Sequence, residues 1–95
     1  MVIHMFAFRW AVAVDDSKRA EILTAIRGLQ NQIPGLLETH VGHNFSPRGL
    51  GYELGGVMKF ESRATFDAYA GHPAHQALLQ WLVPLIEPVE IDFEA

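Results

Sequence analysis

The sequence contains no cysteine, which excludes disulfides, thiolate metal sites and cysteine nucleophiles. This composition fits a reducing compartment. Excess positive charge is also missing: the formal net charge is −4, whereas nucleic-acid binding requires a basic surface. The chain has no P-loop, dinucleotide-binding glycine motif or nucleophile elbow. We therefore predict no cofactor and no nucleic-acid partner.

Long apolar runs are absent as well. Residues 1–14 are mostly apolar, but His4 and Arg9 interrupt them, no basic segment precedes them, and they are too few to span a bilayer. The 95 residues, 49% of them hydrophobic, are typical of one globular domain. Such a domain buries about 60–65% of the surface that its unfolded chain exposes. We expect one cytoplasmic, soluble domain over residues 1–95, with no membrane partner.

Hydrophobic periodicity predicts the element order β-α-β-β-α-β. Strands are expected at residues 2–12, 36–45, 52–60 and 87–93, with turn chemistry at residues 46–51. A first helix is expected to begin at the Asp15–Asp16 cap and to end at Pro34. Its predicted core stripe comprises Ile22, Ile26, Leu29 and Ile33. The order predicts an α+β, ferredoxin-like fold, with an antiparallel four-stranded sheet and the helices on one of its faces.

The first strand is apolar on both faces. Alternate side chains of a strand point to opposite sides, which separates the set Val2, His4, Phe6, Phe8, Trp10 from the set Ile3, Met5, Ala7, Arg9. Two helices can cover only one face of the sheet, so the other apolar face predicts a homodimer in which two sheets meet as a barrel. Met5 and Ile91 are the predicted dimer-facing residues. In the third strand, Gly55 and Gly56 predict a bulge or a close approach of another group.

The main candidate site lies where the second helical region breaks. The helix that Ser62 caps is expected to break at Gly71 and to restart at Pro73. From there His75 shares a face with Leu79, Leu82 and Ile86. A histidine in an apolar stripe needs a hydrogen-bond partner or a task, and Tyr69 is the nearest candidate partner. His75 is therefore either a general base or a core histidine bonded to Tyr69 or to a carbonyl.

The other polar candidates have weaker signals. His4 shares its strand face with Phe6 and Phe8, so it is expected either to join His75 in one pocket or to be a buried residue near the start of the strand. His72 is expected to cap the restarted helix or to lie at the surface. His40 and His43 are predicted to point to opposite faces of one strand, where they cannot chelate one metal. We predict no side-chain metal site.

Three further features are more weakly indicated, and two of them have both a structural and a functional interpretation. Arg48 lies in a Gly/Pro turn, as a solvated side chain or an anion contact. Arg63 and Asp67 are spaced as a surface helix pair. The aromatic residues are expected in the core and at the interface, with a ligand pocket as the alternative; these are Phe6, Phe8, Trp10, Trp81 and Phe93.

Taken together, the residues resemble the stress-responsive α/β-barrel (Dabb) domain family. The resemblance runs nearly from end to end. It rests on His4 and its aromatic-rich strand, on residues 33–35 and 42–49, on Tyr52, on residues 60–62, on residues 69–75 and on Asp92-Phe93. The His-Pro-x-His box with its upstream Tyr69 is the most specific part.

The resemblance implies a homodimeric barrel. One plant branch consists of polyketide cyclases that close a ring by an aldol-type reaction without a cofactor. Tyr69 and His75 match the catalytic pair of that branch, and His4 matches its first-strand histidine. Leu54 stands where the cyclases have a further pocket histidine, so the chain departs from their pattern there. Other plant members are stress proteins, and some relatives bind magnesium through loop carbonyls, which leaves no side-chain signature.

Three functional hypotheses follow. The first is a dimer that binds a small apolar molecule between sheet and helices, with Phe6, Phe8, Leu54, Leu79 and Leu82 as the ligand-binding residues. The second is a cofactor-independent enzyme of the polyketide cyclase, aldol or lyase type, with His75 as base, assisted by Tyr69 and more weakly by His4. The third, by fold analogy alone, is a cofactor-independent monooxygenase.

Overall fold

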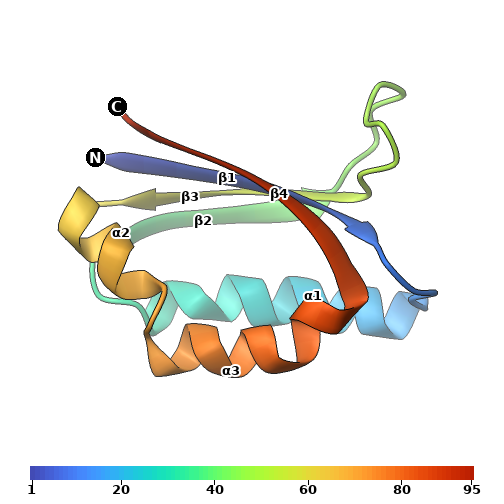
Figure 1. The fold of residues 1–95 in the computed structure, drawn as a ribbon, viewed down its shortest axis with the longest axis horizontal. Coiled ribbons are helices and arrows are strands. Elements are labelled where there is room, and N and C mark those ends of the chain that lie inside the picture. Colours follow the sequence, from blue (N-terminus) through green and yellow to red (C-terminus); the bar gives the residue numbers. More distant parts are fainter.

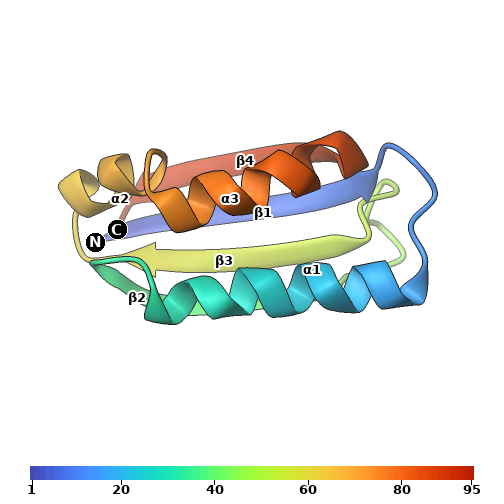
Figure 2. The same ribbon diagram turned by 90° about the horizontal axis from the view of Figure 1, so that it is seen from below.

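The computed structural model describes all residues, 1–95. Along the chain the elements are β1 (Val2–Trp10), α1 (Asp16–Gly28), η1 (Leu29–Asn31), β2 (Leu36–His43), β3 (Leu54–Phe60), α2 (Arg63–Tyr69), α3 (Pro73–Leu82), η2 (Val83–Leu85) and β4 (Ile86–Glu94). The strands form one antiparallel sheet in the order β2-β3-β1-β4. Helices α1 and α3 lie side by side against one face of it (Figure 1, Figure 2). The predicted ferredoxin-like fold is confirmed.

Several element boundaries differ from the prediction. Strands β2 and β3 are shorter than expected because residues 44–53 leave the sheet as a projecting loop (Figure 1), and β1 ends at Trp10, two residues earlier than expected. Asn44 holds the base of this loop, since its Nδ2 donates to the Tyr52 carbonyl at 2.8 Å. Helix α1 begins at the predicted Asp15 cap, which accepts from the Lys18 N–H at 2.8 Å, but its α-helical part ends at Gly28. None of the helices has the length and apolar composition needed to cross a membrane.

Gly56 of β3 allows a close approach of another group, and neither Gly55 nor Gly56 forms a bulge. Register is continuous through β3 against β1, and the irregularity of the sheet lies in β2, between Leu36 and Glu38. Gly56 is paired with Phe6, and a Cβ at Gly56 would overlap the Phe6 ring. The Phe6 ring therefore lies over β3 where Gly56 has no side chain.

The side chains of β1 alternate between the two faces of the sheet as predicted. Val2, His4, Phe6 and Phe8 are buried on the face that the helices cover. Larger side chains from the rest of the chain complete this core, namely Ile22, Ile26 and Leu29 near α1, Met58 and Phe60 of β3, and Leu78 and Leu82 of α3. The predicted stripe of α3 was wrong by about one residue, because Leu78 and Leu82 are buried while His75 and Leu79 lie half-buried at its border.

The phase error has a physical reason. Helix α3 ends at Leu82 and continues as the short 3₁₀ turn η2, which contains Pro84, so Ile86 belongs to β4. A spacing of 3.6 residues per turn cannot be extended through such a change of geometry. Helix α3 packs against α1 in addition to the sheet. The centre of its buried face therefore lies at Leu78 and Leu82.

The opposite face of the sheet is apolar and uncovered. Met5, Val89, Ile91 and Phe93 expose 41%, 42%, 57% and 47% of their surfaces there. Register pairs Met5 with Ile91, so the two residues lie together on neighbouring strands. Ion pairs border this apolar area, with Arg9 Nε 3.2 Å from Glu87 Oε2 and Lys59 Nζ 3.0 Å from Glu38 Oε2. The prediction that β1 is apolar on both faces is confirmed.

We expect the buried face of α3 to dominate the stability of the domain. Leu82 is 2% exposed, so Leu82→Ala should lower the free energy of unfolding by about 2–5 kcal/mol through lost burial and a cavity. Gln80 is exposed on the same helix, and Gln80→Ala should change it by less than about 0.5 kcal/mol. Chemical denaturation of both variants measures the difference, and equal losses would contradict the assigned helix orientation.

Candidate functional site

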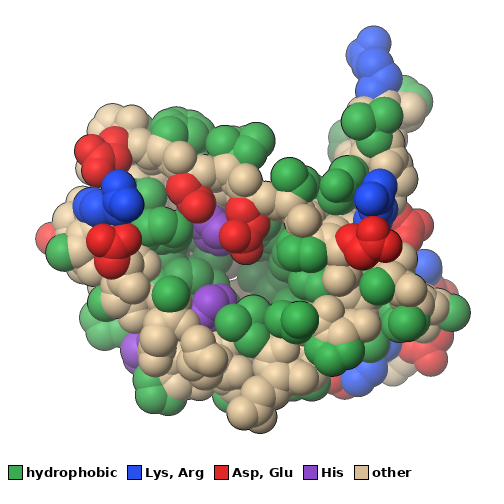
Figure 3. Space-filling view, viewed as in Figure 1, with side chains coloured by type: hydrophobic (Ala, Val, Ile, Leu, Met, Phe, Trp, Pro, Cys, Tyr) green, Lys and Arg blue, Asp and Glu red, His purple; other side chains and the backbone are tan.

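A cavity of about 140 Å³ lies between α3 and the sheet. Its wall is mostly apolar, but four polar side chains reach it, from β1, α2, α3 and β4: His4, Tyr69, His75 and Glu90. The space-filling view shows a hollow between β4 and α3, with histidine side chains within it and acidic side chains near its upper edge (Figure 3). The cavity is therefore accessible from outside along β4.

The break between α2 and α3 positions two of these polar residues. Ser62 and Thr65 form a capping box that starts α2, and the helix ends at Tyr69. The predicted cap of α3 is confirmed, because His72 Nδ1 accepts a hydrogen bond from the Ala74 N–H at 3.0 Å. Pro73 then occupies the first turn, where its missing N–H costs nothing. The chain turns sharply enough to bring His75 back over Tyr69.

The His75 ring is anchored to the backbone of this break. Its Nδ1 lies 3.1 Å from the Ala70 carbonyl oxygen. A carbonyl can only accept, so Nδ1 carries the proton and donates it. In the neutral ring Nε2 is then the unprotonated nitrogen, which is the form that a general base requires.

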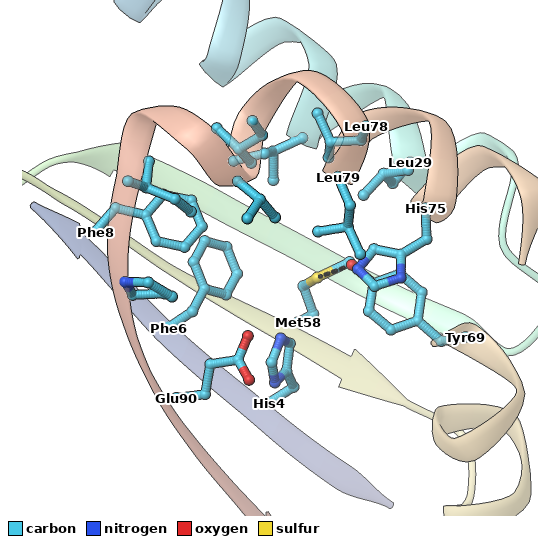
Figure 4. A pocket seen from close by; sticks show the side chains of 15 residues that line it. His4, Phe6, Phe8, Leu29, Met58, Tyr69, His75, Leu78, Leu79 and Glu90 are labelled. Atoms are coloured by element: carbon cyan, nitrogen blue, oxygen red, sulfur yellow. Dashed lines mark hydrogen bonds between the residues drawn. The ribbon is translucent and has the colours of Figure 1, made fainter. Parts of the chain in front are cut away.

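Tyr69 and His75 meet through their rings and not through a direct hydrogen bond. The ring centroids are 4.1 Å apart at an interplanar angle of 32°. The Tyr69 hydroxyl instead donates to Met58 Sδ at 3.7 Å (Figure 4). Of the two partners expected for His75, Tyr69 or a carbonyl, the structure has the carbonyl, because the helix break presents the Ala70 oxygen to the imidazole and β3 supplies the partner of the phenol.

His4 reaches the same space from the sheet. It is 7% exposed, and its ring centroid lies 6.2 Å from that of Tyr69. Its Nδ1 forms a hydrogen bond with Asp92 Oδ1 across the β1–β4 register. A carboxylate accepts this bond, so His4 also carries its proton on Nδ1 when neutral and has an unprotonated Nε2. Tyr69 thus lies between two histidines that are each held through Nδ1.

Sequence reasoning assigned no site role to Asp92 or Glu90 of β4. Asp92 pairs with His4, and Glu90 reaches the cavity beside it (Figure 4). The alternation in residues 87–93 separated these acids from Val89, Ile91 and Phe93, but gave no reason to place the acidic set on the helix side. Register is the missing signal: Asp92 is paired with His4 and Glu90 with Phe6, both of which point toward the helices.

Most of the expected ligand-binding residues line the cavity, with one exception. Phe6, Phe8, Leu79 and Leu82 contribute to its wall. Leu54 is fully buried beside Phe8, its cross-strand partner, and, contrary to expectation, does not line this cavity. The cyclase position that it occupies by resemblance is therefore filled by packing in this chain.

The remaining candidates lie outside the cavity. Trp10 and Trp81 pack against the core, whereas Phe93 lies on the uncovered sheet face. Arg48 is exposed in the projecting loop, and the predicted surface pair joins Arg63 Nε to Asp67 Oδ1 at 3.1 Å. His40 and His43 are exposed, with no third His, Asp or Glu grouped with them as a metal site.

Burial changes the acidity of the central phenol. Removal from solvent raises the pKa of Tyr69 well above its ordinary value, and the negative charge of Glu90 raises this pKa further. The phenol therefore keeps its proton through the physiological range and acts as a hydrogen-bond donor.

Comparison with known proteins identifies the domain. A sequence profile described as the stress-responsive A/B barrel domain, Dabb, matches residues 2–95. The chain belongs to the Dabb family. A search among curated proteins finds no significant match.

Several solved structures have a fold similar to that of this chain. A dimeric ferredoxin-like protein of unknown function from Thermobifida fusca is 26% identical, with a TM-score of 0.86, and the match covers 99% of this chain and 90% of that one. A protein of Arabidopsis thaliana is 24% identical, with a TM-score of 0.89 and coverage of 100% and 95%. Hydroxynitrile lyase from Passiflora edulis is 20% identical, with a TM-score of 0.85 and coverage of 97% and 90%. The last two show likeness of fold.

Proposed function

We propose that this Dabb protein is a homodimer that binds a small, largely apolar molecule in the cavity between sheet and helices. The observation that carries the proposal is the open cavity of about 140 Å³, walled by aromatic and aliphatic side chains with four polar groups at one side. Ligand sites have this composition, in which apolar surface supplies affinity and a few polar groups fix orientation. An apolar cavity of about 150 Å³ is large enough for benzene.

The homodimer rests on the uncovered sheet face. Apolar side chains of β1 and β4 are clustered there, and ion pairs border them. A face of this kind favours burial against an identical face. The Thermobifida fusca relative, which is described as dimeric, supports the same assembly.

Ligand binding can be tested with a probe of the right size. Benzyl alcohol should shift the NMR signal of the Met58 methyl group, because Met58 lines the cavity, and should leave that of Met1 unchanged. Leu79→Trp should fill the cavity and abolish the shift, whereas Gln80→Trp, on the exposed side of α3, should preserve it. A probe that shifts no cavity residue, or that binds equally well to Leu79→Trp, would refute the proposed pocket.

The dimer has its own test. Ile91→Glu should convert the protein to a monomer at micromolar concentration, because a charge would be buried at the centre of the apolar face. Val12→Glu places the same charge at an apolar residue of similar exposure, in the connection after β1, and should leave the dimer intact. Sedimentation velocity distinguishes the two, and a monomeric wild-type protein would exclude the assembly.

Acid–base catalysis in the same cavity is a second candidate function. It is favoured by the two histidines that are held through Nδ1, each with Nε2 available to take a proton. In this scheme His75 removes a proton next to a carbonyl group, and the protonated Tyr69 stabilises the developing oxyanion. The Passiflora edulis neighbour, a lyase, offers an analogy at the level of fold. No feature of the cavity favours the monooxygenase hypothesis.

Proton exchange offers a direct assay of this chemistry. In deuterated water, the protein should accelerate exchange at the carbon next to the carbonyl of phenylacetone, followed by NMR. His75→Ala should abolish the acceleration while the Met58 methyl still reports binding, and Tyr69→Phe should slow it by roughly 10²–10⁴-fold. His43→Ala removes an exposed histidine that lies outside the cavity and should retain exchange. Equal exchange in wild type and His75→Ala would exclude His75 as the base.

A further inference from the structure

Glu90 gives the cavity an uncompensated negative charge. Its carboxylate reaches the cavity from β4, and it joins no ion pair within the chain. No lysine or arginine lines the cavity. The neighbouring cations are engaged elsewhere, since Arg9 pairs with Glu87 on the other face of the sheet, and Arg63 contacts Asp67 and Glu94.

The two histidines and the aromatic rings of the cavity also favour a cationic group. The Nε2 atoms of His4 and His75 are hydrogen-bond acceptors in the neutral rings, because each Nδ1 donates elsewhere. Phe6, Phe8 and Tyr69 place aromatic rings around the same space, and such rings attract cations. The carboxylate of Asp92, behind His4, adds a second negative charge close by.

We propose that Glu90 makes the pocket select a ligand that combines an apolar body, of about the size of a benzene ring, with a protonated amine. This rests on the proposed function of the cavity as a ligand site. The apolar body occupies the wall of aromatic and leucine side chains, and the ammonium group lies toward Glu90 and the imidazole acceptors (Figure 4). A carboxylate at the same end of the ligand would meet Glu90 as a like charge, with no cation to offset the repulsion.

Glu90 differs in orientation from Glu87 of the same strand. It projects to the helix side, whereas Glu87, on the same strand, projects to the opposite side and pairs with Arg9 at 3.2 Å. The two glutamates therefore offer a matched comparison: removing either changes the net charge of the protein by the same amount, but only one of them lies in the cavity.

The test compares three probes with one ring and different charge: benzylamine, benzyl alcohol and benzoate at neutral pH and physiological salt. Affinities come from titrations that follow the Met58 methyl signal. In the wild-type protein benzylamine should bind about fivefold more tightly than benzyl alcohol, the upper range for a contact with an exposed carboxylate such as Glu90, and benzoate should bind most weakly. Glu90→Gln should bring benzylamine and benzyl alcohol to within about twofold, through loss of amine affinity alone. Glu87→Gln should keep the wild-type order.

The outcomes separate this inference from the proposal beneath it. If benzyl alcohol binds but benzoate binds as tightly as benzylamine, or if Glu90→Gln keeps the full preference for the amine, the assigned selectivity is wrong while the ligand site stands. If Glu87→Gln removes the preference as completely as Glu90→Gln, the effect is one of overall charge and the assignment to Glu90 is wrong. If none of the probes shifts Met58, the ligand site itself fails, and the selectivity fails with it.

Discussion

The alternation of side chains along β1 is the constraint on which the rest of the structure depends. β1 is a central strand, with β3 on one side and β4 on the other. The helices cover one face of this strand and leave the other uncovered, so its two sets of side chains lie in different environments (Figure 1, Figure 2). Its even-numbered residues build the core and one wall of the cavity, and its odd-numbered residues build the uncovered apolar face. Shifting β1 by one residue against its neighbours would exchange these sets and destroy both surfaces together.

The fold was predictable because its signals are local and repeated. Capping residues such as Asp15 and Ser62, the turn chemistry of residues 46–51 and the two-residue period of β1 each specify one element, and their order leaves few topologies. Boundaries were less accurate, since a strand ends where its partner ends. Phe45 and Tyr52, near the two ends of the loop of residues 44–53, are of types that are common in strands. Only the path of the neighbouring chain decides where strand pairing stops.

The candidate site was predictable in its members but not in its connections. His4, Tyr69 and His75 were identified because they are polar side chains in otherwise apolar segments of the sequence. All three line one cavity. Their partners came from contacts distant in sequence or from backbone atoms, which have no signature: Asp92 lies 88 residues from His4, and His75 bonds to a carbonyl. Glu90 was missed for the same reason, since a strand with acids on alternate positions gives no indication of which side faces the core.

The break between α2 and α3 has a consequence for how chain length can vary in evolution. Each residue added to a helix turns everything after it by about 100°. One insertion between Ala70 and His75 would move the imidazole off the Tyr69 ring and away from the carbonyl that fixes its tautomer. The projecting loop of residues 44–53 has no such restriction, because its length changes neither sheet register nor helix phase. Insertions and deletions should therefore accumulate in that loop, while the spacing from Tyr69 to His75 stays constant for as long as the pocket is under selection.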